Sequence, residues 1–486
     1  MVLRILIIST SRELAPQPAV PIGAAWVAEA LHLAGFRVMF LDLCFQRDPV
    51  RAVEEAILSF RPEGIALSVR NLDNCDFLSP KTFLPEVKTI VETIKARSDA
   101  RILVGGAGVS IMPLQVLEYL ELDHAVVGEG ERAAPLFFQS RGAREVSLVP
   151  GVVCREPSGI ESPIPAAPFS TDFVTPRMNK WVDSRRYLRL EPVLPVQGKR
   201  GCANRCLYCT YKSIEGGIWR IREAGSVADE IAALMRDTGA REFEFVDSIF
   251  NQPEGYLEIL LEEILRRGLK GKFSISSLSP KGLTVQQVQL MERAGVKSAV
   301  VTPEAASDVT LAALRKDFSE RDVIHAAEIL GRSSIRVLWC FLLGGPKEDE
   351  ATLAKTAGFL NTQLKRKDSA YLTTGIRIYP GTGLREMAIE EGMITADYNL
   401  LMPAFYFSQR LTPQKGMEIL NGTVRHLSRC ILASDTHKTS NETLRLLGTK
   451  IGLPTPFWRY AGYANLFNRR NRSVRQNLAP GPTALE

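Results

Sequence analysis

The sequence predicts an α/β protein in which a doubly wound parallel sheet is followed by a partial barrel. Three observations support this fold class. Short apolar runs alternate with helical patterns over residues 1–140, and the same alternation resumes over residues 191–385. A proline-rich linker with a small hairpin pattern separates the two parts, at residues 141–190. Residues 386–486 have a mostly helical pattern and end in a tail that we expect to be flexible.

The composition is that of a globular protein. At 486 residues the chain has room for two or three domains, each with its own core. A net charge of +6 is small for this length, so the charge does not indicate a nucleic-acid partner. No apolar run approaches the roughly 18 residues of a membrane span, and no integral membrane segment is expected. Eight cysteines are sparse and no secretion signal is evident, which predicts the reducing cytoplasm.

Five short apolar strands are expected in the first part of the chain, with helices between them. They lie at residues 3–8, 37–41, 65–69, 102–104 and 124–127. This alternation is typical of a Rossmann-like parallel sheet covered on both faces, and such sheets bind ligands at the carboxyl ends of their strands. The polar and glycine residues at these ends are Ser68, Arg70, Asn71, Gly105, Gly106, Gly128 and Glu129. Each glycine alone is consistent with a tight turn, but several such ends in register favour a shared ligand.

Six strand–helix units in the second part predict a partial (β/α)6 TIM-like barrel. Its strands are expected at residues 192–197, 241–246, 272–276, 297–302, 335–342 and 371–378. A loop with three cysteines follows the first of these strands. The loop is therefore expected at the carboxyl-terminal mouth of the barrel, where such folds place their chemistry.

The three cysteines of this loop are Cys202, Cys206 and Cys209. Structural zinc and electron-transfer iron–sulfur clusters normally take four protein ligands. No histidine is near in sequence, and no other cysteine lies between Cys154 and Cys340. Three thiolates on a 4Fe-4S cluster would leave one iron open for chemistry. Zinc with a distant fourth ligand, and structural or redox thiols, are the alternatives.

The Cys-x3-Cys-x2-Cys spacing, with Tyr208 before the third cysteine, resembles the signature of the radical S-adenosylmethionine (SAM) enzymes. The resemblance implies that the three thiolates hold a 4Fe-4S cluster, that the open iron binds SAM, and that Tyr208 lies beside the adenine. It also implies reductive cleavage of SAM to methionine and a 5′-deoxyadenosyl radical. The electron would come from an external donor such as flavodoxin or ferredoxin.

The same resemblance assigns SAM contacts to the other strand ends of the barrel. These residues are Asp247, Ser248, Glu304, Gly344, Gly345, Pro346 and Arg377. Arg377 has a second interpretation as a structural ion pair within the barrel, and Asp247 and Ser248 have one as a helix cap. Glu304 lies where relatives often carry Gly-x-Glu-Ser-Gly, but the flanking glycines are missing here. Lys316 is treated as a solvated charge and is not assigned to the site.

The first part of the chain resembles the cobalamin-binding domain (B12-binding type) that precedes many radical SAM cores. The resemblance implies that the residues after the third and fourth strands cradle the nucleotide tail of cobalamin, with Gly128 and Glu129 contributing after the fifth. The motif that supplies a histidine ligand to cobalt is absent, because no histidine lies between Thr10 and Trp26. Cobalamin would therefore bind without a histidine below the cobalt. A degenerate domain that binds no corrin is the alternative.

The function expected from these resemblances is a cobalamin-dependent radical SAM enzyme that methylates an unactivated carbon of a small-molecule or lipid-like metabolite. Ring formation or rearrangement by the same architecture is one alternative, and a radical SAM enzyme with a vestigial first domain is another. A non-catalytic iron–sulfur redox or sensor protein is the third. The aromatic stretch at residues 398–407 is expected either to cover the barrel mouth or to pack in the core.

Overall fold

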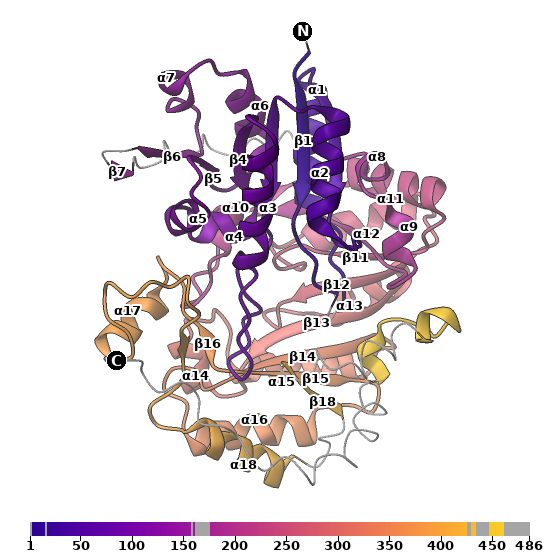
Figure 1. Cartoon of the computed structure of the whole chain (residues 1–486). Coiled ribbons are helices and arrows are strands. Elements are labelled where there is room, and N and C mark those ends of the chain that lie inside the picture. The colour runs from indigo at the N-terminus through magenta and orange to yellow at the C-terminus, as the bar shows by residue number, and fades with distance from the viewer. Residues whose placement is uncertain are drawn as a thin grey trace.

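The computed structural model describes residues 2–14, 17–156, 159–160, 175–424, 429–433 and 447–460. These residues form two α/β units, and Figure 1 shows the N-terminal sheet above the second one. The predicted flexible tail lies outside the described residues, as do residues 157–158 and 161–174 of the proline-rich stretch. No helix within the described ranges is both long and apolar enough to cross a membrane.

The first sheet has seven strands in the order β2-β1-β3-β4-β5-β6-β7. The strands are β1 (Arg4–Ser9), β2 (Arg37–Asp42), β3 (Gly64–Ser68), β4 (Arg101–Gly105), β5 (His124–Val126), β6 (Val152–Glu156) and β7 (Gly159–Ile160). The five predicted strands are confirmed as a parallel set. The predicted hairpin is confirmed as well, and its strands β6 and β7 extend the sheet as an antiparallel edge.

Helices cover both faces of this sheet because the central strands are apolar on both sides. Along β1, Ile5 and Ile7 belong to one apolar cluster, and Leu6 and Ile8 belong to the other. The first cluster contains residues of α1 (Ile22–Leu33) and α6 (Gly130–Gln139). The second contains residues of α2 (Pro49–Phe60), α3 (Leu84–Arg97) and α5 (Pro113–Leu120). The doubly wound arrangement is therefore confirmed.

The second sheet has seven parallel strands in the order β18-β15-β14-β13-β12-β11-β8. They are β8 (Leu194–Val196), β11 (Glu242–Phe245), β12 (Lys272–Leu278), β13 (Val296–Glu304), β14 (Arg336–Leu343), β15 (Ser369–Thr374) and β18 (Cys430–Leu432). The first six are the predicted strands. The short seventh strand comes from the region that was expected to be helical. Among the described strands β8 and β18 do not pair, so the barrel is open between them, as predicted for a partial barrel.

The barrel helices lie outside the curved sheet. They are α11 (Ala224–Thr238), α12 (Tyr256–Arg266), α13 (Val285–Ala294), α14 (Asp308–Ala313), α15 (Glu320–Gly331) and α16 (Glu350–Thr362). Alternate residues of β14, such as Trp339 and Phe341, are buried against them, while the residues between are half-buried toward the barrel interior. Capping boxes at Thr284, Ser319 and Asp349 fix where three of these helices begin.

The last predicted strand is divided in two. β15 ends at Thr374 because Gly375 turns the chain with φ +67°, in the left-handed region that glycine tolerates. The following β16 (Ile376–Arg377) pairs antiparallel with β17 (Phe405–Tyr406), in the predicted aromatic stretch. This region also contains α17 (Gly383–Glu390) and α18 (Pro413–Thr423).

An arm of the first unit reaches the second. It consists of residues 69–83, between β3 and α3, and Figure 1 shows it descending toward the barrel. The two segments of the arm meet at an isolated antiparallel bridge between Asp73 and Thr82. Beyond the bridge, Phe77 stacks on Phe407 with ring centroids 6.1 Å apart and meets Phe405 edge-on at 5.6 Å. The predicted aromatic stretch thus packs against the arm of the other unit.

Candidate active site

The carboxyl edge of the first sheet faces the barrel across a cavity of about 350 Å³. Six of the seven predicted cobalamin residues line this cavity: Ser68, Arg70, Gly105, Gly106, Gly128 and Glu129. Its opposite wall comes from residues around the cysteine loop: Gln197, Arg200, Tyr211, Ile214, Glu215 and Val246. The seventh predicted residue, Asn71, lies outside the lining. With its amide oriented to satisfy its neighbours, Asn71 pairs with the carbonyl and guanidinium of Arg70, each at 3.1 Å.

Gly106 and Glu129, two of the residues predicted to bind cobalamin, also stabilise the protein structure. Gly106 has φ +104°, and a Cβ there would lie 2.6 Å from the carbonyl oxygen of Val69. The glycine is therefore needed for the loops after β3 and β4 to cross. The carboxylate of Glu129 is engaged by two arginines of the second unit, Arg200 at 3.2 Å and Arg220 at 2.5 Å. Glu129 thus lies at the predicted place, but its charge is directed to protein partners.

The cysteine loop is anchored to the barrel at several points. The backbone N–H of Cys202 donates to the carbonyl of Gly216 at 3.1 Å. The N–H of Leu207 donates to Leu314 O at 2.9 Å, and its carbonyl accepts from Leu384 N at 3.0 Å. The thiols are graded in exposure: Cys202 is buried, Cys206 is half-buried and Cys209 is exposed. The loop therefore has a fixed backbone, and the exposure of its cysteines rises from the first to the third.

The three thiols of this loop are separate donors rather than a group converging on one point. Among the residues that the structure describes, no three His, Cys, Asp or Glu side chains are grouped closely enough to hold one metal ion. Thiolate ligands of zinc must lie about 2.3 Å from a common ion. The thiolates of a 4Fe-4S cube bind different irons, so they need not converge on one point. Burial raises the pKa of the Cys202 thiol to about 11, a cost that binding as a thiolate must offset.

Asp247 and Ser248, at the end of β11, hold the start of this loop. The Asp247 carboxylate accepts from the backbone N–H groups of Gly198 at 2.7 Å and Lys199 at 3.1 Å. It also lies 3.7 Å from the ammonium of Lys199, and both side chains are fully buried. The Ser248 hydroxyl donates to the carbonyl of Gly201 at 2.7 Å. Both residues thus position the cysteine loop, and neither caps a helix.

Tyr208 and Glu304 were predicted separately, and the structure brings them together. The Tyr208 hydroxyl donates to the Glu304 carboxylate at 2.6 Å. Lys316 completes the group, with its ammonium 3.1 Å from the Tyr208 oxygen and 3.3 Å from Glu304. Glu304 has φ +70°, a strained conformation for a residue other than glycine. The treatment of Lys316 as a solvated charge was wrong, because its charged neighbours Arg315 and Asp317 gave no signal of burial.

The glycine turn after β14 is occupied by protein. Gly344 has φ +86°, and a Cβ there would lie 2.3 Å from the ring of Phe407. Its N–H donates to the buried carboxyl of Glu348 at 2.5 Å. The following residues, Gly345 and Pro346, are buried in the same turn. The space at Gly344 that was predicted for SAM is thus filled by an aromatic side chain. Glu348 is a buried acid that no pattern in the sequence indicates.

Of the two predicted roles of Arg377, a SAM contact and a structural ion pair, the structure shows the ion pair. Its guanidinium donates to Asp73 of the arm at 2.9 Å and to the carbonyls of Leu400 at 2.6 Å and Ile378 at 2.5 Å. The ion pair is buried, with both side chains at most 3% exposed. Its partner lies in the other unit rather than in the barrel. Arg377 therefore ties the arm to the end of the barrel and is turned away from a ligand role.

Two family models match this chain, and together they cover both units. Residues 13–138 match the B12 binding domain, and residues 196–360 match the Radical SAM superfamily. The chain is similar to tryptophan 2-C-methyltransferase of Streptomyces laurentii, with 26% identity over 51% of this chain and 50% of that protein. It is also similar to hopanoid C-3 methylase of Methylococcus capsulatus, with 26% identity over 65% of this chain and 59% of that protein. The chain thus spans about half to three-fifths of the length of these relatives.

Solved structures share the fold over nearly the whole chain. The radical S-adenosylmethionine methyltransferase TsrM of Kitasatospora setae, solved with cobalamin and a 4Fe-4S cluster bound, superposes with a TM-score of 0.84. The match covers 98% of this chain and all of that one at 19% identity. The cobalamin-dependent S-adenosylmethionine radical enzyme OxsB superposes with a TM-score of 0.68 over 97% of this chain and 75% of that one, at 14% identity. At these identities the likeness is one of fold.

Proposed function

We propose that this chain, which belongs to the radical SAM superfamily and carries a B12-binding domain ahead of its radical SAM domain, is a cobalamin-dependent enzyme that methylates an unactivated carbon of a small-molecule or lipid-like metabolite. One observation carries the proposal most directly. The edge predicted to hold the corrin and the residues around the cysteine loop form opposite walls of the same cavity. Two cofactors that act on one substrate need this proximity.

The residues that would hold each group are separate. Cys202, Cys206 and Cys209 would hold the cluster, and the carboxyl edge of the first sheet, with Ser68 and Arg70, would hold the corrin. When bound, the cluster with SAM supplies a radical that can remove hydrogen from a carbon, and the corrin supplies the methyl group. The hard chemistry thus belongs to the cofactors, and the protein must orient them and exclude water.

The side chains around the cysteine loop suit these tasks. Tyr208, Glu304 and Lys316 hydrogen-bond to one another, so each is fixed in orientation. Phe77 stacks on Phe407, whose ring fills the space beside Gly344.

The substrate class is supported by the relatives. Both relatives have names that state methylation at a carbon, one of tryptophan and one of a hopanoid. These two substrates differ in size and polarity but are both small organic molecules. We therefore propose a small-molecule carbon as the acceptor and an external protein, such as flavodoxin or ferredoxin, as the electron donor.

The test is anaerobic reconstitution with iron and sulfide, followed by titration with hydroxocobalamin. The loaded protein is then incubated with reductant, SAM carrying a labelled methyl group and a metabolite extract. We expect stoichiometric corrin uptake, 5′-deoxyadenosine and a product with the labelled methyl on carbon. Cys206→Ala should lose iron and all activity, whereas Cys154→Ala, a buried cysteine of β6, should retain both.

Two outcomes would contradict the proposal in different ways. Absence of corrin uptake would favour a vestigial first domain. Corrin uptake and SAM cleavage without methyl transfer, with an unlabelled product, would favour ring formation or rearrangement.

A further inference from the structure

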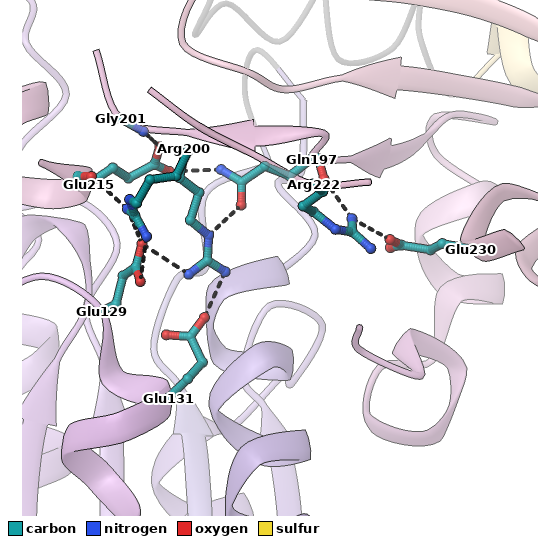
Figure 2. Close-up of polar contacts among 9 residues, drawn as sticks. Glu129, Glu131, Gln197, Arg200, Gly201, Glu215, Arg222 and Glu230 are labelled. Carbon is teal, nitrogen blue, oxygen red and sulfur yellow. Dashed lines mark hydrogen bonds and ion pairs between the residues drawn. The ribbon is translucent and has the colours of Figure 1, made fainter. Parts of the chain in front are cut away.

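A buried network of charged side chains connects the first unit to the second (Figure 2). Arg200 and Arg220 lie opposite one another on the short antiparallel ribbon β9 (Lys199–Arg200) and β10 (Arg220–Ile221). Arg200 reaches Glu129 at 3.2 Å and Glu131 at 2.6 Å, at the start of α6. Its guanidinium also lies 4.4 Å from the ring centroid of Trp26 in α1. Arg200 thus holds the first unit by two carboxylates and one aromatic ring.

The same guanidinium connects to the backbone of the cysteine loop. Its Nε donates to the side-chain oxygen of Gln197 at 3.1 Å, and the amide of Gln197 donates to Glu215 at 2.8 Å. The other oxygen of Glu215 accepts from the backbone N–H of Gly201 at 3.0 Å. Gly201 directly precedes Cys202, and a Cβ at Gly201 would lie 2.0 Å from the carbonyl oxygen of Ile218. A continuous chain of hydrogen bonds therefore runs from the first unit to the residue before the first cysteine.

The charged side chains of the network are largely buried, so each of them depends on its partners for stabilisation. The side chains of Arg200 and Arg220 are 7% exposed, and those of Glu129 and Glu131 are 18% and 14% exposed. Burial opposes the charge of Arg200, but the two carboxylates outweigh it and raise its pKa above the ordinary value. Removing one partner would leave an uncompensated buried charge, so the network resists rearrangement.

The network also forms part of the cavity wall. Glu129, Glu131, Gln197, Arg200 and Glu215 all line the cavity. A ligand that enters the cavity would contact these side chains. The hydrogen bonds that such a ligand would perturb are the ones that lead to Gly201.

We propose that Arg200 is a positioning residue through which occupancy of the cavity and the conformation of the cysteine loop affect one another. This inference rests on the proposed function, because the ligands concerned are the corrin and the cluster. Coupling between two sites is reciprocal: if the cluster orders the loop and this raises corrin affinity, the corrin stabilises the cluster site by the same factor. Couplings of this kind typically change affinity by about 5- to 150-fold.

The experiment compares corrin binding with and without the cluster in the full chain. Hydroxocobalamin is titrated into cluster-free and cluster-reconstituted protein, and affinity is measured by equilibrium dialysis. For the wild type we expect the cluster to raise the affinity by a factor of about 5 to 150. In Arg200→Gln the factor should fall close to one, because glutamine cannot bridge two carboxylates. Mössbauer spectra of the iron should change on corrin addition in the wild type and stay constant in this variant.

Two further variants guard against simple misfolding. Glu131→Gln keeps the shape of the side chain and removes one of the two charges that Arg200 grips, so it should weaken the coupling in a folded protein. Asp368→Ala is the matched control. It removes a buried carboxylate that accepts the backbone N–H of Val337 at 3.0 Å, and neither residue lines the cavity or belongs to the Arg200 network. It should lower stability and leave the coupling intact.

The outcomes separate this inference from the proposed function. Corrin uptake that does not depend on the cluster in the wild type would overturn the coupling alone. The same would follow if Arg200→Gln and Glu131→Gln kept the full wild-type factor. Absence of any corrin uptake by the wild type would overturn the coupling together with the proposed function.

Discussion

At the scale of single residues, Glu348 is a buried acid whose surroundings favour its protonated form. It accepts the N–H of Gly344 and is 1% exposed, and burial raises its pKa to about 7. The pKa of Glu348 is higher in the folded chain than in the unfolded chain. The contribution of its protonated form to the free energy of unfolding should therefore be fully present below about pH 4.5 and should fall as pH rises toward 7. The loss should be on the order of 3 kcal/mol. Glu348→Gln, which cannot ionise, should therefore gain stability relative to the wild type between pH 5 and pH 8.

This prediction is checked by urea unfolding of the cofactor-free protein at the two pH values. Glu350→Gln, at an exposed position at the start of α16, is the control and should follow the wild type. Parallel pH profiles for the wild type and Glu348→Gln would show that the acid does not titrate in this range.

At the scale of elements, the cysteine loop depends on the end of the neighbouring strand β11. Asp247 accepts two backbone N–H groups of the chain that leads into the loop and balances the buried charge of Lys199. Asp247→Asn should lower stability by about 3–5 kcal/mol, since it leaves that ammonium without a counter-charge. It should also lower the iron bound per chain after reconstitution, because the loop loses its anchor.

The matched control for this variant is Ser248→Ala, which removes one hydrogen bond to the carbonyl of Gly201. It should cost about 1 kcal/mol and retain iron. Iron content and thermal unfolding measure both effects. An Asp247→Asn protein with wild-type iron content would mean that the loop is held by its other contacts.

At the scale of the whole molecule, the two units share their cores. One apolar cluster contains Phe137 of the first unit and Phe243 of the barrel, and the other joins Val109 to Leu207 and Ile376. Because these clusters and the Arg200 network cross the boundary, we expect the units to unfold together. Far-UV circular dichroism and tryptophan fluorescence should give one midpoint in urea.

Two single variants sharpen this prediction, because Trp26 lies in α1 of the first unit and Trp339 lies in β14 of the barrel. The Trp26→Phe and Trp339→Phe proteins should each show coincident transitions by both methods. A fluorescence transition separated from the loss of circular dichroism in either variant would indicate that the units unfold independently.

Much of the fold and part of the site could be predicted from sequence. The strands of both sheets are visible as short apolar runs, and the cysteine loop follows its strand as expected. The strand ends that line the cavity were predicted for the same reason, because parallel strands place their carboxyl ends at one edge. The exceptions were β18, which is only three residues long, and the charged side chains Lys316 and Glu348, which occupy buried positions that no periodic pattern marks.

The sequence by itself determined the order of the elements and the set of thiols, because periodicity and spacing are local properties of the chain. Only the tertiary structure decided which partner each polar residue takes. Arg377 pairs with Asp73, which lies 304 residues away in the sequence. Glu129 lies at the edge predicted for a ligand, but its carboxylate forms ion pairs with Arg200 and Arg220. A buried charge must find its counter-charge wherever the packed chain brings one near. The packing of the two units creates that proximity, so the local sequence around either partner cannot predict the pair.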